Sequence, residues 1–94
     1  YLGFALTLNL GLMGIRDKIS LKKPTYGNAY KDKDANILPA NFSDAIANFD
    51  QNKIGREIFG DEFIDYFALS RSHELSLFNE FVTDWEIERY LKIL

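Results

Sequence analysis

The feature that most constrains this chain is its first stretch, YLGFALTLNLGLMGI, in which fifteen residues pass without a charge. Such a run is typical of a membrane span, a signal peptide or a helix buried in a protein. It is shorter than the roughly 20 residues that a bilayer requires, and it contains Thr7, Asn9 and three glycines. No basic region precedes it and no small-residue cleavage site follows. We therefore expect no membrane contact. We expect residues 1–15 to form a buried helix, and the 94 residues to be a piece of a longer protein.

Composition narrows the class of protein further. A chain of 94 residues makes one domain at most, which buries only about two-thirds of its unfolded surface. Because 47% of the residues are apolar, with eight Phe and five Tyr, part of this surface is expected to face a partner. The net charge of −3, without a basic block, argues against nucleic-acid binding. The absence of cysteine excludes a disulfide framework and a thiol nucleophile, and is compatible with the cytoplasmic location that we expect.

The rest of the chain is predicted to be mainly α-helical. Residues 16–40 hold both prolines and no sustained period, which predicts a loop, with a candidate short strand near residues 19–21. Residues 41–60 are predicted to form short helices, with Asn41 as an N-cap and Gly60 as a left-handed C-cap. The apolar stripe that supports the first of these helices is Phe42, Ala45, Ile46 and Phe49.

Residues 61–82 are predicted to form one long helix, capped by Asp61, and residues 83–94 a C-terminal tail. Helical spacing predicts one buried and one exposed side of the long helix. The buried stripe is expected to contain Phe63, Phe67, Phe78 and Phe81, and the exposed positions Asp65, Arg71 and Glu80. Trp85 is expected to pack near Phe81 as the tail departs.

A search for chemistry in these residues is mostly negative. His73 begins the segment HELSL, which is similar to the start of a zinc-protease helix, but Leu77 stands where a second histidine is required. The acids Asp61, Glu62 and Asp65 lie at a predicted helix N-terminus, where negative charge is favourable without any metal. Neither serine of the segment SRS has a base at useful spacing. We therefore predict no catalytic, cofactor-binding or metal-binding residue.

Five short segments nevertheless occur in an order typical of one enzyme family. They are GLMGI, GNAY, LPANFSDAIANF, FGDEFIDYFALSRSHE and VTDWEIERYL. Together they resemble the C-terminal end of glutamine synthetases, and the likeness covers essentially the whole chain. The last segment is most similar to the branch related to gamma-glutamylpolyamine synthetases. The resemblance implies that this chain is the helical C-terminal part of an α+β catalytic domain.

The resemblance also implies the chemistry of a parent enzyme. Such an enzyme uses ATP to phosphorylate the gamma-carboxylate of glutamate, and ammonia or an amine then displaces the phosphate. Mg²⁺ or Mn²⁺ neutralises the transferred phosphoryl group. In the family the catalytic groups lie upstream of the matched stretch, so the fragment alone should be inactive. The alternative is a noncatalytic helical assembly domain related to glutamine synthetase, and the upstream residues would discriminate between the two.

Two further roles are implied by the family. Some bacterial members are switched off by adenylylation of a loop tyrosine, and Tyr30 of GNAYKDKD occupies the similar place; the alternative role for Tyr30 is a loop anchor. Bacterial members also form two stacked rings of identical subunits, in which the C-terminal segment reaches into the opposite ring. The predicted oligomer contacts are Tyr90, Leu91, Ile93 and Leu94. The alternative is packing of these residues against Phe78 and Phe81 of their own chain.

Overall fold

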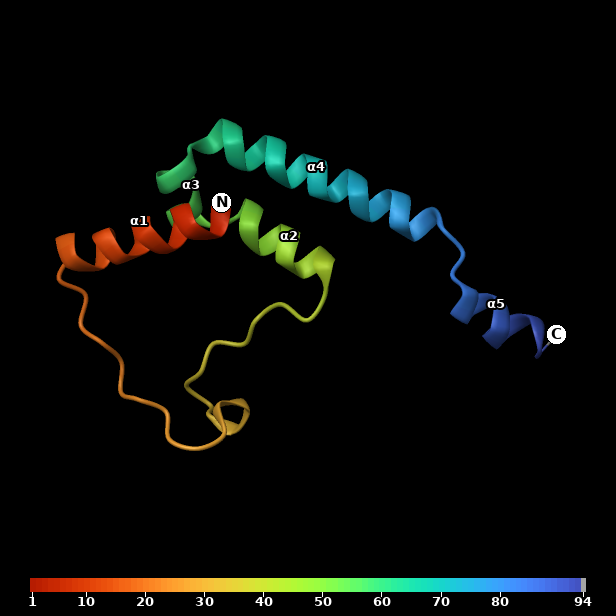
Figure 1. The fold of residues 1–94 in the computed structure, drawn as a ribbon, viewed down its shortest axis with the longest axis horizontal. Helices are drawn as coiled ribbons and strands as arrows, with labels where there is room; N and C mark the ends of the chain where they lie inside the picture. Colours follow the sequence, from red (N-terminus) through yellow and green to blue (C-terminus); the bar gives the residue numbers. More distant parts are fainter. Residues whose placement is uncertain (94) are drawn as a thin grey trace. The chain divides into compact units, whose positions relative to one another are not determined.

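The computed structural model describes residues 1–93, and their regular structure is helical (Figure 1). The elements are α1 (Leu2–Arg16), the 3₁₀ turn η1 (Ala29–Lys31), α2 (Phe42–Asp50), α3 (Lys53–Phe59), α4 (Asp61–Glu80) and α5 (Asp84–Leu91). No strand occurs within the described range, so the mainly α fold class is confirmed, and the candidate strand near residues 19–21 is wrong. The contacts divide the chain into two units, Tyr1–Leu38 and Pro39–Leu94, which are described separately.

In the first unit, α1 satisfies its own polar side chains. Thr7 donates a hydrogen bond to the carbonyl of Gly3 at 2.8 Å, and the Asn9 amide donates to the carbonyl of Ala5 at 2.8 Å. These internal bonds reduce the number of unpaired side-chain donors that burial of the helix would leave. None of its residues is buried within the described chain, so burial inside a longer protein stays a prediction.

The end of α1 is fixed by its backbone. Lys18 has a φ of 51°, in the left-handed region. The N–H groups of Lys18 and Ile19 donate to the carbonyls of Ile15 and Gly14 at 3.3 and 3.0 Å. This paired arrangement is a Schellman motif, formed where the charged residues Arg16, Asp17 and Lys18 interrupt the apolar run. It sends the chain into the long loop that carries η1.

In the second unit, asparagines begin the two short helices. The Asn41 side chain accepts a hydrogen bond from the N–H of Asp44 at 2.8 Å, so the predicted N-cap of α2 is confirmed. Asn52 accepts in the same way from Gly55, at 2.8 Å, and begins α3. Such caps satisfy backbone donors that have no partner within the helix.

The junction between α3 and α4 differs from the prediction. Gly60 ends α3, but its φ of 84° and ψ of 154° lie outside the left-handed helical region. This backbone conformation is essentially restricted to glycine. Asp61 is the first residue of α4 and makes no cap hydrogen bond, so its predicted capping role is wrong. The glycine therefore supplies a sharp change of direction between the two helices.

The core of the second unit forms where α2 and α3 pack against α4. Ile64 is fully buried and Ala68 is 7% exposed. Gly55 of α3 helps to bury Ile64, because a Cβ at Gly55 would lie only 3.7 Å from the Ile64 Cδ1 atom. A file of aromatic rings flanks this contact, with centroid separations of 5.2 to 5.8 Å, and its members are Phe49, Phe67, Phe63 and Phe59.

The buried side of α4 is therefore not the predicted phenylalanine stripe. Phe67 is only half-buried, and Phe63 is 37%, Phe78 64% and Phe81 70% exposed. The reason is the length of the covering helix: α2 has 9 residues and α4 has 20, so α2 cannot cover all of α4. Arg71 was predicted to be exposed and is instead half-buried, whereas Asp65 and Glu80 are exposed as predicted.

Candidate functional site

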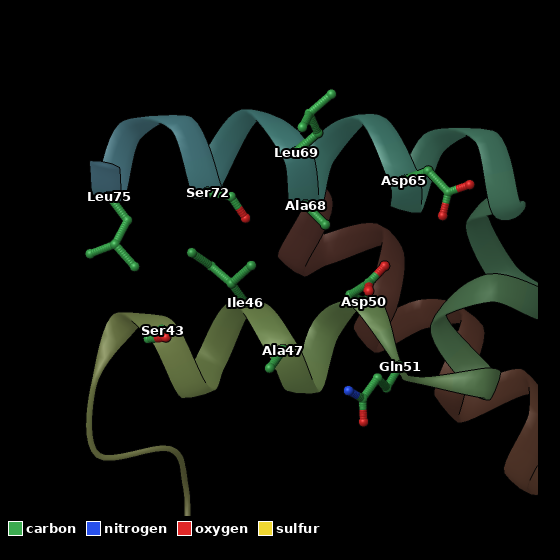
Figure 2. Close-up of a pocket in the computed structure, with 10 residues that line it drawn as sticks. All are labelled: Ser43, Ile46, Ala47, Asp50, Gln51, Asp65, Ala68, Leu69, Ser72 and Leu75. Atoms are coloured by element: carbon green, nitrogen blue, oxygen red, sulfur yellow. The ribbon is translucent and has the colours of Figure 1, made fainter. Parts of the chain in front are cut away.

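An open cleft of about 450 Å³ lies between α2 and α4 (Figure 2). Ile46 and Ala68 line its apolar middle, and Ser43 and Ser72 add hydroxyl groups. The carboxylates of Asp50 and Asp65 lie at the same end of the cleft in Figure 2. A volume of this size is within the range of small-molecule sites. Whether the cleft could bind a ligand through these two carboxylates depends on whether they are already paired within the chain.

Both carboxylates are engaged by one arginine of α3. Arg56 lies 2.7 Å from Asp50, 3.0 Å from Asp61 and 2.8 Å from Asp65, and its Nε donates to the carbonyl of Asp50 at 2.8 Å. Hydrogen bonds to Asp61 and then Asp65 raise the pKa of Arg56 above its usual value. The guanidinium therefore connects the end of α2 and the start of α4 to α3. The role of the three carboxylates is to hold these helices together through their ion pairs with Arg56. We call this group the Arg56 cluster.

The Arg56 cluster was missed by the sequence interpretation. The acids at the start of α4 were assigned to the helix dipole alone. Arg56 precedes Asp61 by five residues and Asp65 by nine, and these separations match no i, i+3 or i, i+4 pairing on one helix. The arrangement becomes visible only when the turn at Gly60 brings α3 alongside α4.

The described residues contain no candidate metal cluster and no candidate membrane-spanning helix. Over residues 1–93, no three histidine, aspartate or glutamate side chains gather so as to hold a metal ion. His73 is exposed, and its carbonyl accepts a hydrogen bond from Ser76 at 2.8 Å. None of the described helices is both long enough and apolar enough to cross a bilayer.

The loop of the first unit presents Tyr30 on a defined turn. Tyr30 is fully exposed, and its N–H donates to the side chain of Asn28 at 3.0 Å. Thr25 donates to Asp32 at 2.6 Å and closes the turn, while Asp32 also accepts from the N–H of Asp34 at 3.0 Å. The hydrogen bond from Thr25, followed by that from Asp34, lowers the pKa of the Asp32 carboxyl. The phenol of Tyr30 is thus accessible on a locally ordered turn.

The predicted tail contains helix α5, which the sequence interpretation did not foresee. Thr83 accepts a hydrogen bond from the Glu86 N–H at 3.3 Å, and Glu86 accepts from the Thr83 N–H at 2.7 Å. This reciprocal capping box starts the helix at Asp84. The bonds from the Thr83 backbone and hydroxyl lower the pKa of the Glu86 carboxyl. The tail is therefore a preformed short helix.

The predicted oligomer contacts are accessible on and beyond α5. Tyr90 is 56%, Leu91 68% and Ile93 67% exposed, while Leu94 lies outside the described residues. The expected packing of Trp85 on Phe81 is replaced by an edge-on contact with Tyr90, at 6.2 Å between ring centroids. Since Phe78 and Phe81 are also mostly exposed, the described residues give no support to the alternative of intrachain packing.

The fold and these sites define a helical part of a protein. Many of its apolar side chains are exposed, and the acids Asp50, Asp61 and Asp65 form ion pairs with Arg56. The family described as glutamine synthetase, catalytic domain, matches residues 1–90. The chain belongs to this glutamine synthetase family, so the resemblance inferred from its five segments is confirmed.

Curated relatives include enzymes named for different nitrogen donors. A glutamate–isopropylamine ligase of a Pseudomonas species is 38% identical over 100% of this chain and 21% of its own length. Type-1 glutamine synthetase 2 of Dictyostelium discoideum is 37% identical over 100% of this chain and 19% of its own length. A gamma-glutamylethanolamide synthetase of Streptomyces coelicolor is 33% identical over 95% of this chain and 19% of its own length. The chain thus spans about a fifth of the length of these relatives. No solved structure matches it.

Proposed function

We propose that this chain is the C-terminal part of an ATP-dependent ligase that joins ammonia or an amine to the gamma-carboxylate of glutamate. The observation that carries the proposal is the match to the glutamine synthetase catalytic domain along residues 1–90. Two of the relatives are named for isopropylamine and ethanolamide chemistry. These names support an amine as the nitrogen donor, and a polyamine is our specific proposal within that class.

The proposed cofactors are ATP with Mg²⁺ or Mn²⁺, bound outside these residues. The acids of the Arg56 cluster do not suit a metal, because Asp50, Asp61 and Asp65 each pair with Arg56. A cation placed there would have to displace a guanidinium already held by three carboxylates. The 94 residues are therefore proposed to be inactive alone. We also propose that the full-length protein is cytoplasmic and binds neither nucleic acid nor membrane.

The proposed role of this chain is assembly of identical subunits into stacked rings. Tyr90, Leu91, Ile93 and Leu94 would enter a subunit of the opposite ring. The exposure of the first three supports the proposal. Burial of three aliphatic side chains contributes roughly 5–8 kcal/mol per tail, before ordering costs are subtracted. The capping box of Thr83 and Glu86 lowers that ordering cost, because the helix exists before docking.

A second candidate function is covalent regulation at Tyr30. Its full exposure on a turn held by Asn28 and by the Thr25–Asp32 bond supports access by a modifying enzyme. An adenylyltransferase with labelled ATP should label the full-length protein, and Tyr30→Phe should abolish the label. Equal labelling of the variant would assign Tyr30 to loop anchoring.

The ligase proposal is tested by comparing the full-length protein with the 94-residue chain. Each is incubated with glutamate and ATP, together with ammonia or one of a panel of amines and polyamines. The full-length protein should release phosphate and form a gamma-glutamyl product, and the 94-residue chain should do neither. Glutamate-dependent ATP turnover by the short chain would contradict an active site outside it. An inactive full-length protein that still assembles would favour the noncatalytic alternative.

A further inference from the structure

Arg56 of α3 and Arg71 of α4 have opposite surroundings. Arg56 pairs with three carboxylates, whereas no carboxylate of the described residues lies within ion-pair distance of Arg71. Arg71 is half-buried, and its Nε atom is buried without a hydrogen-bond partner. A buried donor that stays unpaired costs free energy, and a half-buried cation costs more. Arg71 therefore lacks the partner that its position requires.

The surroundings of Arg71 form an apolar groove. Its guanidinium lies over the ring of Phe67, 5.5 Å from the centroid, and its Nη2 donates to the Ser70 hydroxyl at 3.0 Å. The groove has a volume of about 290 Å³. Its walls come from α2 and α4, and the residues are Phe42, Ala45, Ile46, Phe49, Phe67, Ala68 and Arg71. We call it the Arg71 groove; Arg71 is its one charged residue.

A second hollow of about 630 Å³ shares Phe42 with the Arg71 groove and extends toward Phe78. Along α4, Phe67, Arg71 and Phe78 are separated by four and seven residues, spacings that place them on one helical face. A segment bound along this face of α4 would therefore contact two phenylalanine rings with the Arg71 guanidinium between them. A planar guanidinium stacked on an aromatic ring is well suited to a carboxylate.

We propose that the Arg71 groove docks an apolar, carboxylate-bearing segment of the same full-length polypeptide. Charge complementarity supports this occupant, because a carboxylate would satisfy both the charge and the free Nε of Arg71. The length of the relatives supports it as well, since the chain covers only 19–21% of three of them. This inference rests on the proposed function, in which the 94 residues are the C-terminal part of a longer ligase.

The test places a reactive amine in the groove of the full-length protein. Arg71→Lys keeps the positive charge, and the introduced amine can be joined to a paired carboxylate by a zero-length carbodiimide. Mass spectrometry of the digest should then find peptides that contain the introduced lysine linked to an acidic residue outside the 94-residue chain, within one polypeptide. His73→Lys, on the same helix at an exposed position, is the matched control and should not give that link. Arg71→Met should lose it.

Other results would overturn the docking proposal. A link between two copies would assign the groove to a subunit interface, and a link confined to Glu74 would show only a neighbour one turn along the helix. The absence of any link in the folded variant would also contradict it. Ligase activity of the unmodified protein is measured in parallel. Activity without the link refutes the docking alone, whereas the link without activity refutes the proposed function alone.

Discussion

The two halves of α4 differ in what covers them. The first half carries Ile64 and Ala68, which are buried against α2 and α3 and held by the Arg56 cluster. The second half carries Phe78, which is 64% exposed, and is followed by α5 with Leu91 68% exposed. Exposed apolar surface of this extent favours association. One end of the second unit is thus stabilised by its own chain, and the other leaves apolar side chains exposed.

The largest effect is expected at the uncovered end. Deletion of Leu91–Leu94 from the full-length protein should separate stacked rings, because it removes up to roughly 5–8 kcal/mol of gross burial per tail. The subunits should stay folded, since the described deleted residues are largely exposed in their own chain. Sedimentation velocity measures the assembly and circular dichroism the fold. Glu88→Ala, an exposed change on α5, is the control. Unchanged rings, together with a large loss of subunit stability, would show that the tail packs against its own chain.

The next effect is expected at the covered end. Ile64→Ala should lower the free energy of unfolding by about 2–5 kcal/mol, because it leaves a cavity between α3 and α4. The matched control is Glu80→Ala, at an exposed position of the same helix, which should change it by less than about 0.5 kcal/mol. Urea denaturation of the 94-residue chain, followed by circular dichroism, compares the two. Similar midpoints would show that Ile64 is not central to the core.

Helix existence was readable from the sequence, whereas helix burial was not. Periodicity and the Asn41 cap were sufficient to place α2 and α4, because both signals are local. The buried face of α4 depends on which neighbours cover it. Phe78 lines an open hollow beside the start of α2 and stays 64% exposed. Helix α5 was missed because residues 83–94 were interpreted as a tail, and the capping box at Thr83 was not recognised. A Thr followed three residues later by Glu was the available signal.

The candidate sites show the same division. Tyr30 and the apolar end of the chain were found from short segments and a family resemblance, and their roles remain proposals. The Arg56 cluster and the unpaired Arg71 were not found. Both depend on contacts between helices: α3 with α4 for Arg56, and α2 with α4 for the Arg71 groove. Local patterns in a single sequence do not reveal such contacts, because each contact involves residues from separate elements.

A smaller effect is expected from the Arg56 cluster. Arg56→Met should lower the melting temperature more than Arg56→Lys, because methionine leaves Asp50, Asp61 and Asp65 to repel one another. Added salt screens charges, so it should raise the melting temperature of Arg56→Met and lower that of the unmodified chain slightly. Melting curves of the 94-residue chain at two salt concentrations give this comparison. Equal melting of the two variants would show that the ion pairs contribute little.

The smallest effect is expected from protonation of the α5 cap. Hydrogen bonds from Thr83 lower the pKa of Glu86 from its ordinary 4.5, so folding favours the charged carboxylate. The resulting stabilisation is present above pH 4.5 and is lost as the pH falls through the lower folded-state pKa. Trp85, the single tryptophan of the chain, lies in α5 and reports its state by fluorescence.

Glu86→Gln is the matched control for this pH effect, because glutamine can also complete a capping box but does not titrate. The unmodified chain should show a fluorescence transition below pH 4.5 that Glu86→Gln lacks. The lowered pKa values of Asp17 and Asp32 belong to the first unit, and they are common to both proteins. The difference between the two curves therefore isolates α5. Coincident curves would mean that the Thr83–Glu86 box does not hold the start of this helix, and that the uncovered end lacks a preformed element.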